Sequence, residues 1–234
     1  MINGDRCTRA CGFCAVSTAK PFALEGDEPV RVAEAIRRMR LKHVVITAVA
    51  RDDLADGGAN HFAQTIRAIR DLDPEIVIEV LTPDFNGKDI SLQLVLDARP
   101  DIFNHNLETV ERLTPYVRSR AKYRLSLTVL RHAKQLDPGV VTKSGIMLGL
   151  GENETELFQA MDDLREANVQ VLTLGQYLRP TPAHLPVVEY IHPETFDLFR
   201  QVAERKGFEY VASGPLVRSS YHAADYHPVR RRST

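Results

Sequence analysis

The sequence predicts an α/β fold with a parallel sheet, because short apolar runs alternate with amphipathic helical segments through most of its 234 residues. Runs with so few polar residues are typical of strands that are covered on both faces. No linker, low-complexity tract or solenoid-type repeat interrupts the alternation, so one domain spanning 1–234 is expected. The crossovers between such strands are expected to be right-handed. Both a barrel and an open doubly wound sheet have crossovers of this hand, so both remain possible.

Six apolar runs are the expected strands: 43–49, 76–81, 102–106, 141–150, 170–177 and 210–217. Three of the intervening segments carry apolar residues at i, i+4 and i+7, which lie on one helix face and are expected to pack against the sheet. The three stripes are Val32, Ile36 and Met39; Phe62, Ile66 and Ile69; and Leu157, Met161 and Leu164. Pro193 suits the first turn of a further helix.

Composition and charge narrow the classes of function. Apolar residues make up 44% and charged residues 26% of the chain, which is the balance of an ordinary globular protein. The formal net charge of −1 provides no overall field that would attract nucleic acid or an anionic membrane. No apolar run approaches the roughly 18 residues of a membrane span, and no signal segment is apparent, so a cytoplasmic protein is expected.

The cysteines are the strongest chemical signal. All three lie in the first 14 residues as Cys7, Cys11 and Cys14, with the spacing C-x3-C-x2-C. An odd and clustered set cannot form a distributed disulfide framework, so it indicates a metal site in a reducing compartment. Three thiolates leave one iron of a cubane cluster without a protein ligand, and an open position is what a catalytic metal needs. A zinc knuckle or three unconnected thiols are the alternatives, but zinc needs a fourth ligand and the first histidine is His43.

With the aromatic residue Phe13 before the last cysteine, this segment resembles the signature of the radical S-adenosylmethionine (SAM) superfamily. The resemblance implies a 4Fe–4S cluster whose open iron binds SAM, and Phe13 is expected beside that cofactor. It also implies that SAM is cleaved reductively to give a carbon radical, so no side chain is expected to act as a catalytic acid or base. The fold that it implies is a partial parallel βα barrel with the cluster loop after the first strand.

Seven further segments resemble, in order, the motifs of the lipoyl synthase family, and they cover nearly the whole chain: 51–59, 79–85, 103–109, 142–145, 175–178, 184–187 and 212–222. This resemblance implies a sulfurtransferase that inserts two sulfur atoms into an octanoyl group on a lipoyl-carrier domain or protein. It also implies an electron donor such as flavodoxin or ferredoxin, and an iron–sulfur carrier. Neither nucleic acid nor a membrane is expected as a partner.

Asn104, Asn106 and Glu108 close the third expected strand at alternating positions, which would point their polar groups to one side. With the family resemblance they are expected to contact SAM; the alternative is that they satisfy local backbone groups. Lys143 could meet a carboxylate or be a paired charge inside the barrel, and the sequence leaves the role of His184 open.

A second site is expected at the 218–221 motif after the last strand. The resemblance implies that a serine there ligates an auxiliary 4Fe–4S cluster that is consumed as the sulfur donor. Ser219 is assigned, with Ser220 as the competing choice, and a simple polar loop is the alternative. A serine oxygen is a hard ligand that iron releases more easily than thiolate, which suits a cluster that is dismantled.

The resemblance also implies three more cysteines, in a C-x4-C-x5-C motif upstream of the first cluster, and this sequence holds only three in all. We expect a fragment that lacks this segment and part of the first strand, so that the auxiliary cluster forms only if the full protein supplies those ligands. The alternatives are a radical SAM enzyme that cleaves SAM without transferring sulfur, and a non-catalytic metal-binding module.

Overall fold

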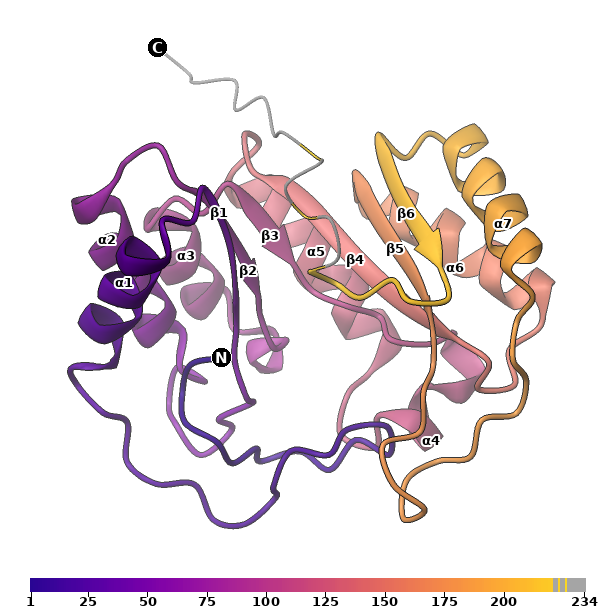
Figure 1. Cartoon of the computed structure of the whole chain (residues 1–234), viewed down its shortest axis with the longest axis horizontal. Coiled ribbons are helices and arrows are strands. Elements are labelled where there is room, and N and C mark those ends of the chain that lie inside the picture. Colours follow the sequence, from indigo (N-terminus) through magenta and orange to yellow (C-terminus); the bar gives the residue numbers. More distant parts are fainter. Residues whose placement is uncertain (221–222, 224–225, 227–234) are drawn as a thin grey trace.

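The computed structural model describes residues 1–220, 223 and 226, and within them forms one parallel sheet in which the strands follow their order in the chain (Figure 1). The strands are β1 (His43–Thr47), β2 (Val77–Leu81), β3 (Ile102–Asn104), β4 (Val141–Leu148), β5 (Val171–Gln176) and β6 (Tyr210–Gly214). β1 and β6 form the two edges, so the sheet is curved but not closed. The α/β fold with a partial parallel barrel is confirmed.

Helices connect the strands. They are α1 (Glu28–Met39), α2 (Ala59–Leu72), α3 (Asp89–Asp97), α4 (Thr114–Val117), α5 (Tyr123–Leu136), α6 (Glu154–Glu166) and α7 (Pro193–Arg205), with single 3-10 turns η1 (Phe85–Gly87) and η2 (Glu111–Leu113). The longer helices lie on the outer side of the curved sheet, and α4 lies at one end of it (Figure 1). Pro193 begins α7 as expected. No helix in the part of the chain that the structure describes is long and apolar enough to cross a membrane.

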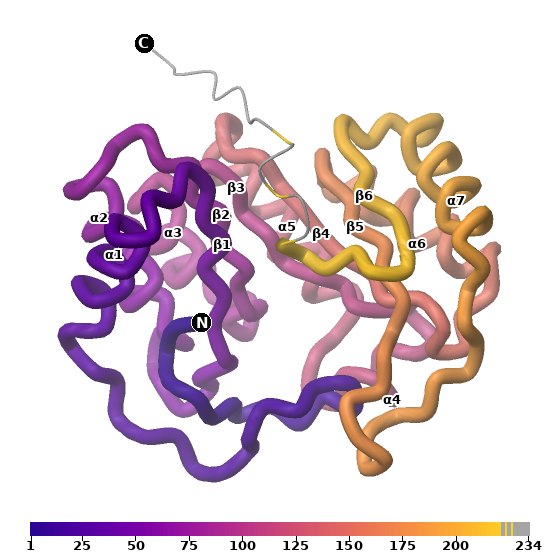
Figure 2. The backbone as a smooth tube through the Cα atoms, viewed as in Figure 1, coloured from indigo at the N-terminus to yellow at the C-terminus, as the bar shows by residue number. Residues whose placement is uncertain are grey.

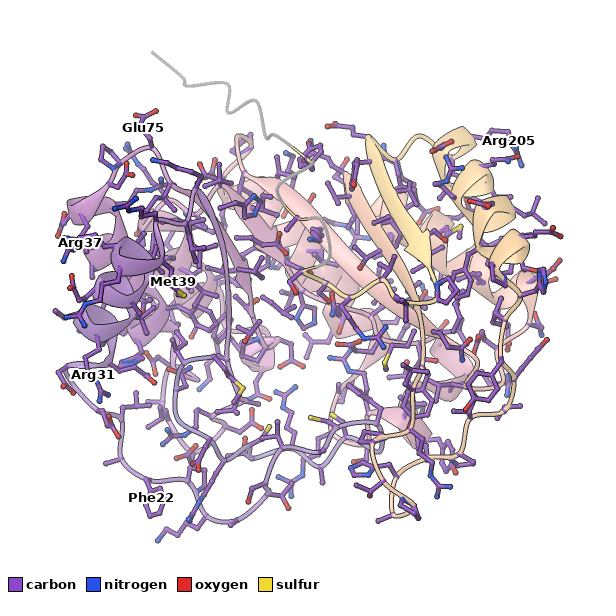
Figure 3. The ribbon with its side chains drawn as sticks, in the orientation of Figure 1. Phe22, Arg31, Arg37, Met39, Glu75 and Arg205 are labelled. Atoms are coloured by element: carbon purple, nitrogen blue, oxygen red, sulfur yellow. The ribbon has the colours of Figure 1, made fainter. Side chains whose placement is uncertain are left out.

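Two of the three expected apolar stripes are confirmed, and one is wrong at its end. Phe62 and its partners on α2 are buried, as is the stripe on α6. On α1, Ile36 is buried but Met39 is 61% exposed on the outer surface (Figure 3). The reason is local: α1 ends at Met39, and Arg40 adopts a left-handed conformation with φ of 53°, so the last turn leaves the core.

The expected strands were mostly too long at their carboxyl ends. The third was expected over 102–106, yet β3 ends at Asn104. The sixth was expected over 210–217, yet β6 ends at Gly214. Three of the extra residues, Asn106, Tyr177 and Val217, line a pocket beyond the strand ends, where parallel α/β folds place their ligand sites.

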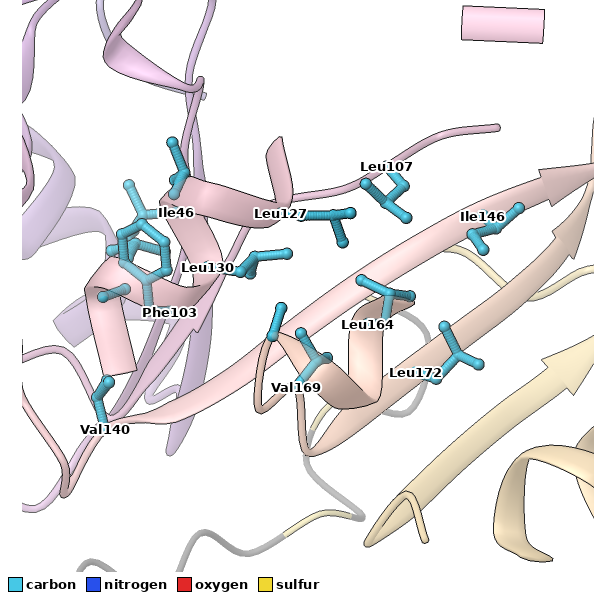
Figure 4. Close-up of a cluster of buried hydrophobic side chains, with 14 of the residues drawn as sticks. Ile46, Phe103, Leu107, Leu127, Leu130, Val140, Ile146, Leu164, Val169 and Leu172 are labelled. Atoms are coloured by element: carbon cyan, nitrogen blue, oxygen red, sulfur yellow. The ribbon is translucent and has the colours of Figure 1, made fainter. Parts of the chain in front are cut away.

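The main core lies between the sheet and its helices, where side chains of β1, β3, β4 and β5 meet those of α5 and α6 (Figure 4). Leu127 and Leu130 on α5 are buried there. The rings of Phe62 and Phe85 meet edge to face, with centroids 6.2 Å apart. This packing holds the strand ends in fixed positions, which a binding site at those ends requires.

The first residues of the chain run beside β1 before they turn into the cysteine loop. The N–H of Ile2 donates to the carbonyl of Thr47 at 2.8 Å, and the Ile2 side chain is buried. The tube view shows this segment passing from the edge of β1 along one end of the barrel toward α4 (Figure 2). The cysteine loop therefore lies at the carboxyl end of the sheet.

Candidate cofactor site

Cys7, Cys11 and Cys14 are free thiols in one half-buried loop at this end of the barrel. The N–H of Cys7 donates to the carbonyl of Ser17 at 2.8 Å, so the loop returns on itself. The N–H of Cys14 donates to the carbonyl of Cys11 at 3.0 Å in a tight turn. These bonds close the segment that carries the three cysteines into a compact loop.

The surroundings of the loop favour the neutral form of two of its thiols, Cys11 and Cys14. The pKa of Cys11 is raised to about 11, chiefly by burial; Cys14, Glu108 and Cys7 add to the rise, while Arg118 opposes it. Burial likewise raises the pKa of Cys14, with Cys7 again adding to the effect. Thiols that discourage one another's ionisation lie close together, and bound iron would relieve that repulsion.

The donor set therefore fits an iron–sulfur cluster in its chemistry. Within the described residues, however, no three cysteine, histidine, aspartate or glutamate side chains are already arranged as a metal-binding group.

Arg9 ties the cysteine loop to the barrel. Its guanidinium donates two hydrogen bonds to Asp84, at 2.7 and 2.6 Å, and two to Asp52, at 3.0 and 2.9 Å. Burial alone would raise the pKa of Asp84, but the hydrogen bonds and charge of Arg9 lower it to about 2. This interaction of Arg9 with Asp52 and Asp84, which we call the Arg9 clasp, was not predicted from the sequence. The available signals were an arginine between two cysteines and two aspartates in segments that resemble family motifs.

The loop is braced on its other side by the segment before α7. His184 Nε2 lies 3.2 Å from the carbonyl oxygen of Cys14, and the N–H of Leu185 donates to the carbonyl of Gly12 at 3.0 Å. A Cβ at Gly12 would lie 2.8 Å from Leu185 Cγ, so glycine permits this close approach. The open question about His184 is thus answered: it contacts the backbone of the cysteine loop.

A pocket of about 320 Å³ opens beside Phe13 at the carboxyl ends of the strands. We call it the barrel pocket; it is lined by Phe13, Leu81, Asn106, Glu108, Gly145, Ile146, Met147, Thr173, Gly175, Gln176, Tyr177, Leu178, Val217, Arg218 and Ser219. It brings together four residues that the sequence analysis assigned to cofactors, from segments far apart in the chain. Their roles stay predictions.

Asn106 is the central polar group of the barrel pocket. Its Nδ2 donates to Glu108 Oε1 at 3.0 Å and to Ser219 Oγ at 2.8 Å. Its Oδ1 is buried and has no hydrogen-bond partner among the described residues. A buried acceptor without a partner is costly, so the pocket is suited to a ligand that brings a donor, such as an amine or a hydroxyl.

Two residues of the pocket wall, Glu108 and Gly145, have unusual backbone surroundings. Glu108 has φ of 65°, which is unfavourable for a residue with a side chain and is found often at functional sites. Burial raises the pKa of its carboxyl group. A Cβ at Gly145 would lie 2.6 Å from Thr173 Oγ1 and 3.0 Å from Asn106 Oδ1, so only glycine keeps this part of the pocket open.

Asn104 is placed differently from Asn106 and Glu108. The expectation of three alternating residues on one strand was wrong, because β3 ends at Asn104 and the other two residues lie in the loop that follows. Asn104 does not line the barrel pocket; its Nδ2 donates to the buried Glu79 at 2.8 Å. Its assignment as a SAM contact stays a prediction without a place in the pocket.

Ser219 and Ser220 are distinguished by their surroundings. Ser219 lines the barrel pocket and receives the hydrogen bond from Asn106, whereas Ser220 is exposed. Tyr221, the last residue of the expected motif, lies outside the described residues. The geometry favours Ser219 over Ser220 as the residue that faces a ligand.

Comparisons with known proteins agree with the sequence motifs. The model of the radical SAM superfamily matches residues 1–164. A lipoyl synthase from Rubrobacter xylanophilus is 57% identical over 232 residues, which cover 99% of this chain and 72% of that protein. A lipoyl synthase from Geobacillus kaustophilus is 59% identical over 223 residues, which cover 95% of this chain and 75% of that protein.

Solved structures support the fold at much lower identity. Methylornithine synthase matches with a TM-score of 0.69 at 13% identity, over 98% of this chain and 77% of that one. SuiB of Streptococcus suis, bound to its precursor peptide SuiA, matches with a TM-score of 0.69 at 10% identity, over 91% of this chain and 48% of that one. At such identities the likeness shows only that the barrel is shared.

Proposed function

We infer that this chain, which belongs to the lipoyl synthase family of the radical SAM superfamily, is a sulfurtransferase that inserts two sulfur atoms into a protein-bound octanoyl group. The observation that carries the inference is the placement of three thiols and the barrel pocket at one end of the barrel, in a chain 57% identical to a lipoyl synthase. The family implies a 4Fe–4S cluster, SAM and an octanoylated lipoyl-carrier substrate.

Cys7, Cys11 and Cys14 are the proposed ligands of the SAM-binding cluster. When bound, the cluster and SAM supply reductive cleavage and hydrogen-atom abstraction, which no side-chain acid or base can perform on an unactivated alkyl carbon. The loop that carries the thiols is held on one side by Arg9 and on the other by His184. Those contacts support the proposal because they hold the loop at the mouth of the barrel pocket.

The chain's own contribution is to orient the bound molecules and exclude water. The buried, unpartnered Asn106 Oδ1 would accept a hydrogen bond from SAM, and Glu108 would lie beside the bound cofactor. Leu81, Met147 and Val217 are apolar residues of the same pocket, suited to keep water from an alkyl chain. Holding the reacting groups in one orientation is the larger part of what a protein adds to such chemistry.

Ser219 is the proposed fourth ligand of an auxiliary 4Fe–4S cluster. Its Oγ faces the barrel pocket, which supports this role. All three cysteines of the sequence are already assigned to the SAM-binding loop, so Ser219 is the one ligand of an auxiliary cluster that we assign. The chain covers 72% to 75% of the two relatives described above. A flavodoxin or ferredoxin as electron donor and an iron–sulfur carrier complete the proposal.

The test is anaerobic reconstitution of the chain with iron and sulfide, followed by iron analysis and a 5′-deoxyadenosine assay with SAM and a reductant. We expect about four irons per chain, the content of one cubane cluster, and cleavage of SAM. Cys11→Ser should lose both, whereas Ser220→Ala, a change at an exposed serine, should lose neither. Zinc in the untreated protein, with no SAM cleavage after reconstitution, would contradict the proposal and favour a structural metal module.

A second function is favoured by one observation, namely that the sequence holds no cysteine outside the SAM-binding loop. A radical SAM enzyme that cleaves SAM without transferring sulfur would have this cysteine content. With an octanoylated carrier as substrate, mass spectrometry distinguishes the two functions: sulfur insertion gives a lipoyl group, whereas the second function gives 5′-deoxyadenosine and no lipoyl product.

A further inference from the structure

A buried ion pair crosses the inside of the barrel beneath the barrel pocket. Glu79 on β2 is fully buried, and Lys143 on β4 is 3% exposed. Lys143 Nζ lies 2.9 Å from Glu79 Oε1 and 3.0 Å from Oε2. Asn104, on the strand between them, donates its own hydrogen bond to Glu79. Three neighbouring strands thus each contribute one residue to this buried cluster.

The same ammonium group reaches the segment that follows β6. Lys143 Nζ donates to the main-chain carbonyl oxygen of Ser219 at 2.6 Å. On its other side Ser219 accepts the hydrogen bond from Asn106 at Oγ. The segment 215–220 turns back from β6 toward β4 across the open side of the barrel (Figures 1 and 2). Ser219 is therefore held at two atoms by two residues of the barrel.

Apart from Val217, whose side chain is buried and whose carbonyl oxygen lies close to Gly175, the described residues give this segment few other contacts. After β6, the main-chain hydrogen bonds found among the described residues are local, from Val217 N–H to Gly214 and from Ala223 N–H to Ser220. Arg218 reaches the carbonyl of Gln176 only at 3.5 Å. A segment without strand or helix pairing keeps much of its conformational freedom unless side chains fix it.

We propose that Lys143 is a positioning residue: held in place by Glu79, it fixes the main chain at Ser219 and so aims the Ser219 hydroxyl into the barrel pocket. The chemistry is suited to this task. An ammonium has three donors, and here they are shared between a carboxylate and a carbonyl. A buried ion pair is rarely worth more to stability than a well-packed apolar pair, so its use here is better explained by the geometry that it imposes.

Glu79 holds the Lys143 ammonium group in place. Burial opposes its ionisation, yet the neighbouring His43, 3.9 Å away, the charge and hydrogen bond of Lys143, and the hydrogen bond from Asn104 together lower its pKa. The carboxylate therefore stays charged and keeps the lysine in place. The consequence for the reaction rests on the proposed function, in which Ser219 is an iron ligand.

The test is amide hydrogen exchange of the chain reconstituted with its cluster, read on peptides that cover 215–220. Lys143→Met alone would leave Glu79 charged and unpaired, so the informative variant is Glu79→Met with Lys143→Met, which removes both charges. We expect this double variant to keep the iron content of the wild type and to raise exchange in 215–220 about tenfold. Lys143→Arg, which keeps a cationic donor, should restore part of the protection.

The matched control is Tyr123→Phe, which removes a buried hydrogen bond of 2.8 Å to Asp163 that is remote from the segment. It should leave exchange in 215–220 unchanged. If the methionine pair does not fold, Glu79→Gln with Lys143→Gln is measured in the same way, with the same expected rise. Unchanged exchange in whichever double variant folds would overturn the proposal.

The readout separates this inference from the proposed function, because exchange is measured without any turnover. A rise in exchange together with unaltered sulfur insertion, in an enzyme that carries all its cluster ligands, would overturn the claim that Lys143 aims Ser219 for the reaction. Loss of SAM cleavage in the wild-type chain would instead count against the proposed function and leave the exchange result standing.

Discussion

Arg9 offers the sharpest test of how the cysteine loop is held. Arg9→Met removes a guanidinium whose side chain is 7% exposed and leaves Asp84, at 1%, without its partner. The pKa of Asp84 is about 2 in the fold, against 3.8 for a free aspartate. Each pKa unit corresponds to about 1.36 kcal/mol, so the ionised Asp84 carboxylate, with Arg9 as its largest favourable partner, stabilises the neutral-pH fold by roughly 2 kcal/mol.

Asp52 adds less, because solvent screens its partly exposed carboxylate. The unpaired buried charge of Asp84 adds to the loss, so we expect Arg9→Met to lower the free energy of unfolding by about 3 kcal/mol. The assay is urea unfolding of the metal-free chain followed by circular dichroism. Iron bound per chain after reconstitution should also fall, because Arg9 lies between Cys7 and Cys11.

Two further variants show whether the argument is right. Arg9→Met with Asp84→Asn removes the stranded charge and keeps the acceptor for the Asn86 N–H, so it should regain at least about 1 kcal/mol. Arg37→Met breaks an exposed pair with Glu34 and should change stability little. If the free energy of unfolding of Arg9→Met lies within about 1 kcal/mol of the wild-type value, the Arg9 clasp does not hold the loop and the reasoning is refuted.

Three other predictions test separate parts of the molecule. Because the folded pKa of Asp84 lies below its unfolded value of 3.8, its contribution is present above about pH 4 and is lost as the pH falls toward 2; Asp84→Asn should flatten this fall in the urea midpoint. Gly175→Ala would place a Cβ 2.2 Å from the carbonyl oxygen of Val217, so it should displace that segment and cost about 1 to 3 kcal/mol in thermal or urea unfolding. Phe62→Ala in the core should cost about 3 to 5 kcal/mol, whereas Met39→Ala on the surface should cost almost nothing; similar losses would contradict the burial pattern.

Local patterns in the sequence predicted much of the fold. The stripe on α2 could be recognised from Phe62 and its neighbours because helical spacing is a property of one short segment. The same pattern failed at Met39, since periodicity does not show where a helix passes beyond the core. The strand ends were misplaced for a related reason: Asn106 belongs to a pocket wall, and its polarity serves that wall and not the sheet.

The sequence by itself determined the alternation of strands and helices, the three-cysteine loop and the family, because each depends on residues that are neighbours in the chain or on motifs that occur in order. Only the tertiary structure decided which side chains meet. Arg9 and Asp84 are 75 residues apart, Lys143 and Ser219 are 76 apart, and Asn106 and Ser219 are 113 apart. No local spacing encodes such pairs: they form because parallel strands end at one edge of the sheet and bring their loops together there.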